Sequence, residues 1–273
     1  YLNLTIGMAV AILVGSVILG GIKSIARVVS KIVPFMCVFY IVGGLVILAM
    51  NYDKIVGAFG TIFYYAFHTP ESVTGGLFGA VIRQGVARGL FSNEAGLGSA
   101  AIAHGAARTD EPVREGLVAM LGPFIDTILI CSMTAIVIII TGSYEICHEK
   151  SELTSRAFEI GLGSAWGSKF VLVAMIFFAF STIIAWSYYG DRAADYLFGK
   201  KAVKPYRWIY LGFVVLGSCM TIDVVINFCD AMNGLMAIPN LIALILLSGQ
   251  VVNMTGDYLN RQKEIDDVTP DRK

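Results

Sequence analysis

The feature that most constrains this chain is a series of long apolar segments that carry almost no charge. A helix that crosses a membrane needs about 20 mostly apolar residues, because the hydrocarbon is about 30 Å thick and each residue rises about 1.5 Å. Six stretches of the 273 residues approach or meet this length: Leu4–Ile22, Ile32–Met50, Gly116–Tyr144, Phe170–Gly190, Trp208–Ile222 (extending to about Phe228) and Ala231–Val252.

The composition also indicates that lipid is the solvent. Hydrophobic residues make up 56% of the chain and charged residues 15%, with a mean hydropathy of +0.73; soluble domains carry about 25% charge. Lys plus Arg equals Asp plus Glu at 20 each, so the chain lacks the basic excess of a nucleic-acid binder. The five Cys show no metal-binding spacing. The chain opens at Tyr1 without a basic leader, so we expect a C-terminal piece of a longer protein.

A seventh segment, Gly75–Ala107, is rich in Gly and Ala but contains Arg83, Arg88 and Glu94. An ionised side chain at the bilayer centre costs roughly 2.5–3.5 kcal/mol, so these three side chains must face protein or water. We expect the helix to break over residues 91–98. Ser92 and Asn93 are strong N-caps for a second half-helix, and two glycines loosen the backbone after them.

Such a junction at mid-depth suits a zwitterion. We expect unpaired carbonyls near residues 89–91 to attract an ammonium group and free amides near residues 94–98 to attract a carboxylate. The segment therefore predicts a binding site for a free amino acid. The alternative is a flexible membrane helix whose polar residues only make interhelical hydrogen bonds.

The distribution of basic residues predicts the orientation. Cytoplasmic loops carry an excess of Lys and Arg. Alternate connections and the tail place fourteen basic residues on one side against four on the other, provided that Gly75–Ala107 crosses the membrane. The tail is then cytoplasmic and Tyr1 lies near the outer face. We divide the chain into a transmembrane core, residues 1–252, and a cytoplasmic tail, residues 253–273.

Two connections on the predicted outer side are long. Asn51–Thr74 is aromatic with few charges, which is typical of an interfacial helix, and Cys147–Lys169 is polar and expected to form a partly helical cap. Ordinary surface loops are the alternative for both.

Three stretches resemble one family. Gly89-Leu-Phe-Ser-Asn-Glu-Ala-Gly-Leu-Gly-Ser-Ala100 closely resembles the signature of the alanine/glycine:cation symporters, the sodium:alanine amino-acid carriers. Phe124–Cys131 and Trp186–Asp191 look like two further stretches of that family. The resemblance implies an all-α polytopic membrane protein with the leucine-transporter-like fold of inverted repeats. The seven spans would be core helices four to ten, with one of them, the sixth, discontinuous.

The resemblance also implies site residues. Phe91, Ser92, Asn93 and Gly96 would contribute to the substrate site, and Trp186 would be the pocket wall that limits the substrate to a small side chain. The adjacent hydroxyls of Ser181 and Thr182 would be Na⁺ ligands. The alternatives are hydroxyls bonded to their own helix and a tryptophan that anchors in lipid.

Other polar residues in the spans have open roles. Asp126, with Thr127 beside it, is a functional candidate by its depth, but it equally suits a structural partner of Arg83 or Arg88. Glu94 is a coupling candidate that also suits pairing with Arg88 or capping. For His104 we expect helix packing rather than proton relay.

Enzymatic function is not expected. Ser99 and His104 are five residues apart and point to different faces of a helix, and neither Gly-x-Ser-x-Gly nor His-Glu-x-x-His occurs. We predict a secondary active transporter of the cytoplasmic membrane that carries alanine or glycine with Na⁺ and needs no cofactor. The alternatives are a cation channel and a proton-coupled amino-acid carrier.

Overall fold

The structure is a computed structural model that describes residues 1–68, 77–147 and 152–268, and no strand occurs within these ranges. The elements follow in this order: α1 (Leu2–Ile18), α2 (Ile22–Met50), α3 (Tyr52–His68), α5 (Leu77–Ser92), α6 (Ser99–His104), α7 (Pro112–Ala119), α8 (Leu121–Pro123), the π-helix η1 (Phe124–Cys131), α9 (Ser132–Thr141), α10 (Ser143–Ile146), α11 (Leu153–Leu162), α12 (Trp166–Phe198), the 3₁₀ turn η2 (Lys200–Ala202), α13 (Val203–Cys219) and α14 (Ile222–Val268).

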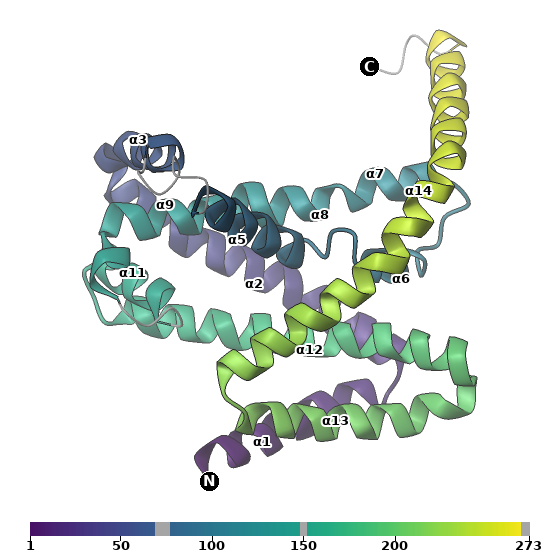
Figure 1. Cartoon of the computed structure of the whole chain (residues 1–273), viewed down its shortest axis with the longest axis horizontal. Helices are drawn as coiled ribbons and strands as arrows, with labels where there is room; N and C mark the ends of the chain where they lie inside the picture. The colour runs from purple at the N-terminus through teal and green to yellow at the C-terminus, as the bar shows by residue number, and fades with distance from the viewer. Residues whose placement is uncertain (69–76, 148–151, 269–273) are drawn as a thin grey trace.

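The long helices run back and forth between two ends of the molecule (Figure 1). The connections α1–α2, α6–α7 and α12–α13 lie toward one end, and α3 and α11 lie at the other. α5 and α6 follow each other along the same direction, so the interrupted segment runs from one end of the bundle to the other. α14 crosses in front of α12 and then extends away from the bundle.

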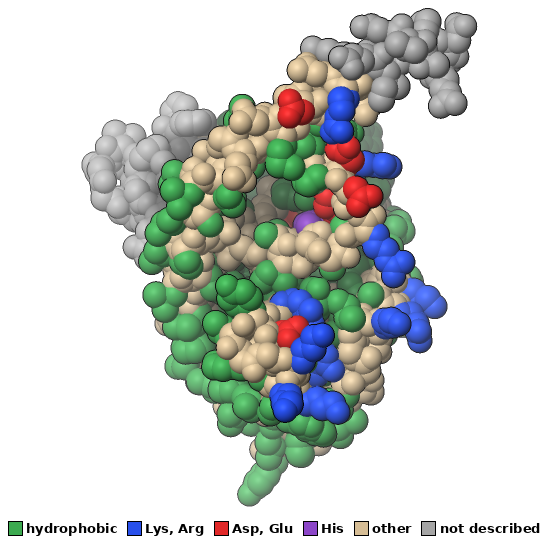
Figure 2. Space-filling model, turned by 90° about the vertical axis from the view of Figure 1, so that its right-hand side faces the viewer, with side chains coloured by type: hydrophobic (Ala, Val, Ile, Leu, Met, Phe, Trp, Pro, Cys, Tyr) green, Lys and Arg blue, Asp and Glu red, His purple; other side chains and the backbone are tan. Residues whose placement is uncertain are grey.

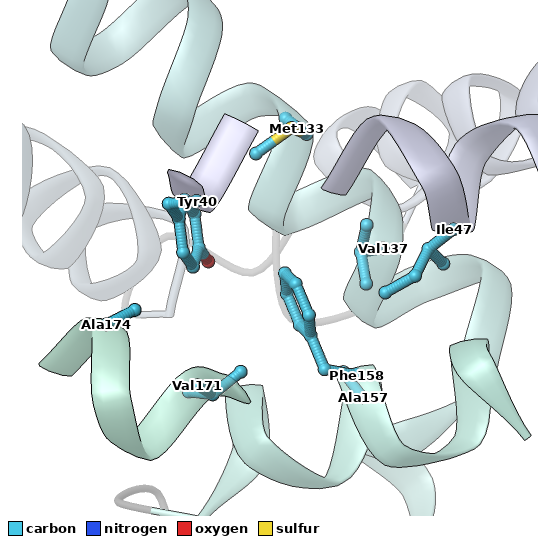
Figure 3. Close-up of a cluster of buried hydrophobic side chains, with 8 residues drawn as sticks. All are labelled: Tyr40, Ile47, Met133, Val137, Ala157, Phe158, Val171 and Ala174. Carbon is cyan, nitrogen blue, oxygen red and sulfur yellow. The ribbon is translucent and has the colours of Figure 1, made fainter. Parts of the chain in front are cut away.

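Two apolar clusters hold this arrangement. The first lies where α2, α9, α11 and α12 meet and consists of Tyr40, Ile47, Met133, Val137, Ala157, Phe158, Val171 and Ala174 (Figure 3). Glycines allow its close contacts, because a Cβ at Gly44 would overlap Met133 and one at Gly161 would overlap Ile47. The second cluster joins α1, α2, α12 and α13 through Val14, Val17, Ile18, Ile25, Ile184 and Leu211. Both clusters include α2 and α12, which form the scaffold beside the broken segment.

The helices fit a membrane, and the predicted all-α class is confirmed. Four described stretches are long and apolar enough to cross it: Ile22–Met50, Pro112–Thr141, Trp166–Phe198 and Ile222–Gln262. α1 is apolar but has 17 residues, and α5 and α13 are shorter than 18 residues as well. Seven crossings therefore remain a prediction, as does their numbering as core helices four to ten.

The two long connections contain the helices that the sequence predicts. α3 occupies most of Asn51–Thr74, and α11 lies within Cys147–Lys169, although residues 69–74 and 148–151 are outside the described part of the chain. The aromatic rings of α3 are largely exposed, with Tyr64 and Tyr65 each more than half accessible. The position of these helices at a lipid interface stays a prediction.

Basic side chains gather at the end of the molecule that contains the α1–α2, α6–α7 and α12–α13 connections (Figure 2). The exposed members are Lys23, Arg27, Lys31, Arg108, Arg114, Arg192, Lys200, Lys201 and Lys204. The fold therefore brings together the three connections that the charge argument assigns to one side. Which side of a membrane this end faces stays a prediction.

At this end α12 and α13 are joined by a buried ion pair. Arg207 donates to both carboxylate oxygens of Asp191 at 2.7–3.1 Å, and the Asp191 side chain is 2% exposed. A single charge left in such a site lacks both solvent and partner. The pair Arg192–Asp195 on the same helix, at 3.6 Å, is much more exposed.

This contrast gives a prediction for stability. Arg207→Gln leaves the Asp191 carboxylate buried without its counter-ion, and we expect the free energy of unfolding to fall by about 3–5 kcal/mol. The matched change Arg192→Gln at the exposed pair should cost about 0–1 kcal/mol. Unfolding of the purified protein in mixed micelles measures both. Equal losses in the two variants would contradict a structural role for the buried pair.

Candidate functional site

The helix breaks within the predicted stretch. α5 ends at Ser92, α6 begins at Ser99, and residues 93–98 form turns and bends. Three residues in the break have left-handed backbone: Glu94 (φ 52°), Gly96 (φ 77°) and Gly98 (φ 86°). Left-handed geometry costs most L-residues roughly 1–2 kcal/mol but costs glycine little, so the two glycines explain why the chain turns here.

The predicted capping was wrong in detail. Ser92 is the last residue of α5, and α6 begins after Gly98 with no side-chain cap. Asn93 closes the first half instead, because its Nδ2 donates to the Gly89 carbonyl at 2.9 Å. Ser and Asn are strong N-caps, but Asn also ends helices, and local preference does not distinguish the two roles.

The predicted unpaired carbonyls are also corrected. The carbonyls of the last turn of α5 accept amides from the break: Gly89 from Asn93 (3.1 Å), Leu90 from Ala95 (3.0 Å) and Phe91 from Glu94 (3.2 Å). The amides differ. Within the described part of the chain, the N–H groups of Gly96 and Gly98 have no hydrogen-bond partner. Among the described residues, the carbonyls of Ser92, Asn93, Ala95 and Leu97 accept no hydrogen bond either, so the break offers both donors and acceptors.

The first side of the break contacts η1. The Ser92 hydroxyl donates to the Asp126 carboxylate, and the Asn93 amide and Thr127 hydroxyl exchange hydrogen bonds at 2.8 and 3.0 Å. η1 is a π-helix directly after Pro123, which lacks the N–H that an α-helix would use there. π-Helical turns occur frequently at functional sites. Four predicted site residues are thus brought together in one hydrogen-bonded cluster.

The partners that the sequence left open for Arg88 are not observed, and the pairing of Asp126 with Arg83 stays untested. Arg88 does not pair with Asp126 or Glu94; it donates to both carboxylate oxygens of Asp230 on α14, at 3.2 and 2.7 Å. The side chain of Arg83 lies outside what the structure describes. His104 pairs with Glu115 of α7, with Nδ1 to Oε1 at 2.7 Å, a contact that the packing interpretation omitted.

The second side of the break contacts α12. The Tyr189 side chain lies near the Glu94 side chain and interacts with it electrostatically. Tyr189 in turn packs edge-to-face on Trp186, with ring centroids 5.4 Å apart. One aromatic contact therefore connects the predicted pocket-wall tryptophan to the break.

Ser181 and Thr182 are not in contact with the break. The Ser181 side chain is buried against α2, where its hydroxyl lies 3.3 Å from the Met36 sulfur and donates to the Phe178 carbonyl at 3.0 Å. This bond within α12 is the alternative to Na⁺ binding that the sequence left open for Ser181. Thr182 is exposed. Their role as Na⁺ ligands stays a prediction.

The third side of the break contacts α14, which the sequence argument did not single out. Asn240 Nδ2 donates to the Gly96 carbonyl at 2.9 Å. Asp230, ten residues before Asn240 on the same helix, binds Arg88. A signal was present, because polar residues at 230, 233 and 240 fall on one face of a largely apolar helix.

Comparison with known proteins identifies the family. Residues 1–271 match the sodium:alanine symporter family. The chain belongs to this family. It is 47% identical over 252 residues to the sodium/alanine symporter AgcS of Methanococcus maripaludis, covering 91% of this chain and 55% of AgcS. An uncharacterised transporter of Haemophilus influenzae is 46% identical over 265 residues, covering 95% of this chain and 58% of the relative.

A third relative is the sodium/proton-dependent alanine carrier protein of Bacillus sp. (strain PS3). It is 32% identical over 280 residues, covering 96% of this chain and 63% of the relative. The chain thus spans a little more than half the length of these relatives. The family is one of membrane transporters, and its members' names indicate amino-acid carriers.

The geometry of the break gives a second prediction. Gly98→Ala places a Cβ on left-handed backbone and 3.1 Å from the Asn240 Oδ1, so we expect a loss of about 1–2 kcal/mol in unfolding free energy. The control is Gly116→Ala in α7, where no atom lies within 4 Å of the new Cβ. There we expect no loss, because alanine favours helix. Unfolding in mixed micelles compares the two; an unaffected Gly98→Ala would contradict the strained turn.

Proposed function

We propose that the protein is a secondary active transporter that carries a small neutral amino acid, alanine or glycine, across the cytoplasmic membrane together with Na⁺. The observation that carries the proposal is the break between α5 and α6, which coincides with the stretch that resembles the family signature. A break inside a membrane-crossing segment is tolerated where the backbone is buried in protein or lines a cavity. In this proposal it lines the substrate site.

The substrate site consists of Phe91, Ser92, Asn93 and Gly96 with Trp186 as a wall. Phe91 is 43% exposed, so its ring is available to a ligand or another segment. The free amide of Gly96 suits a substrate carboxylate. Trp186 restricts the room for a side chain, which favours alanine or glycine over larger amino acids.

The polar cluster on η1 couples the site to the ion. Asp126 is a carboxylate close to the break, and its contact with Ser92 transmits a change of charge to the first half of the segment. Thr127 binds the Asn93 side chain, and Glu94 lies near Tyr189 of α12. Ser181 and Thr182 are the proposed Na⁺ ligands, because hydroxyl oxygens suit a hard cation.

The driving force is electrical as well as chemical. One elementary charge that moves through 100 mV yields about 2.3 kcal/mol, enough for roughly fifty-fold accumulation of a neutral amino acid. Na⁺ occupancy favours the conformation that accepts substrate, and rocking of the helices exchanges access between the two sides. The leucine-transporter-like arrangement is the fold in which we place these steps.

The orientation follows from charge. We place the basic end of the molecule, including the tail after residue 252, on the cytoplasmic side. A hollow of about 500 Å³ opens between α7 and α14, lined by Glu111, Asp257 and Arg261 among others. On this assignment the hollow faces the cytoplasm and provides room for substrate release.

Proton coupling is the second candidate. The observation that favours it is the name of the Bacillus relative, which is described as sodium/proton-dependent. The pair His104–Glu115 provides a titratable contact between α6 and α7.

Uptake of labelled alanine by the full-length protein in liposomes tests the proposal. We expect accumulation with an inward Na⁺ gradient and little without it. Uptake that follows a proton gradient and ignores Na⁺ would establish the second candidate. Ion current without amino acid would indicate a channel, and no uptake under any gradient would reject amino-acid transport.

The proposed site residues give a third prediction. Asn93→Ala and Trp186→Ala should each raise the KM for alanine about tenfold or more, since each removes a hydrogen bond or a wall of the site. The controls are Asn253→Ala and Trp208→Ala, which alter exposed residues of α14 and α13. Thermal unfolding of each variant monitors folding. An unchanged KM in either site variant removes that residue from the site.

A further inference from the structure

α14 lies along the broken segment with a polar face. Asp230 binds Arg88 near the end of α5, and Asn240 binds the Gly96 carbonyl within the break. Residues 230, 233, 237 and 240 repeat on one helix face at spacings of three and four. These two anchors fix the register of α14 against the segment. Asn233 therefore lies between them, one turn beyond Asp230.

Asn233 is the unsatisfied residue on this face. Its Nδ2 atom is buried and has no hydrogen-bond partner, whereas the Asp230 and Asn240 side chains on either side of it are both bonded. Buried polar groups in proteins are almost always paired, so an orphan donor requires an explanation. An acceptor on a bound molecule would satisfy this donor.

A second orphan lies at the same break. Ser99, the first residue of α6, is fully buried, and its hydroxyl has no partner. It follows Gly98, where an added Cβ would lie 3.1 Å from Asn240 Oδ1 of α14. The amides of Gly96 and Gly98 are also free. Several unmet groups around the break are N–H donors, for which a carboxylate is a suitable acceptor.

We propose that Asn233 of α14 is a substrate-binding residue whose side-chain amide donates to the carboxylate of the bound amino acid. The inference rests on the proposed function and extends its site to an element that the motif does not include. Arg88 is neutralised by Asp230, so a neutral amide performs the recognition without adding charge to the membrane interior. A carboxylate also accepts more strongly than a neutral carbonyl.

Asn233→Asp is the sharpest test, because it preserves shape while it replaces the donor by an acceptor. Binding of alanine and of alaninamide to the full-length purified protein is measured in Na⁺. For Asn233→Asp we expect the alanine affinity to fall about tenfold or more, while the affinity for alaninamide, which can donate to the new carboxylate, does not fall. The matched control is Asn253→Asp on an exposed part of α14, where neither affinity should change.

Asn233→Ala is the second variant, in case the aspartate does not fold. It should weaken alanine binding while leaving unchanged the thermal stabilisation by Na⁺ without amino acid. Equal losses for alanine and alaninamide in Asn233→Asp, a loss of the Na⁺ effect in Asn233→Ala, or unchanged alanine affinity in either would overturn the inference. If the unmodified protein binds no alanine, the proposed function itself fails, which is a separate result.

Discussion

Backbone groups that leave a helix inside a protein need hydrogen-bond partners, and the contacts around residues 93–98 are arranged by this requirement. The break meets it in part, with contacts on three sides. Ser92 and Asn93 bond to η1, Glu94 lies near Tyr189 of α12, and Asn240 of α14 bonds to the Gly96 carbonyl. Helices far apart in sequence are thus held around one short turn.

The apolar clusters support the helices, and the side chains that contact the break are attached to those helices. α2 and α12 contribute to both clusters, so they form a rigid frame on which Trp186 and Tyr189 are fixed. η1 continues directly into α9, whose Met133 and Val137 belong to the first cluster. The hydrogen-bonding side chains of the break therefore rest on well-packed supports, as a site that must recognise a small ligand requires.

The sequence predicted the features that depend on neighbouring residues alone. The position of the break followed from glycines and polar residues in an apolar span, and the all-helical class followed from apolar length. The direction of capping did not follow, because Asn93 suits either end of a helix. The partner of Arg88 was missed because Asp230 is 142 residues away, and only the packing of α14 brings it near. The π-helical turn had no signal beyond Pro123 and the neighbouring polar pair.

α14 has a mechanical consequence. Its 47 residues correspond to a rod of about 70 Å, more than twice the thickness of the hydrocarbon. Between Asn240 and Val268 lies about 40 Å of helix, and within it Arg261 binds Glu111 at the start of α7 at 3.0 Å. One continuous helix therefore ties the turn at residues 93–98 to the entrance of α7, about 30 Å away along its axis. A spectroscopic label on the exposed side of this stretch would report whether the two attachments move together.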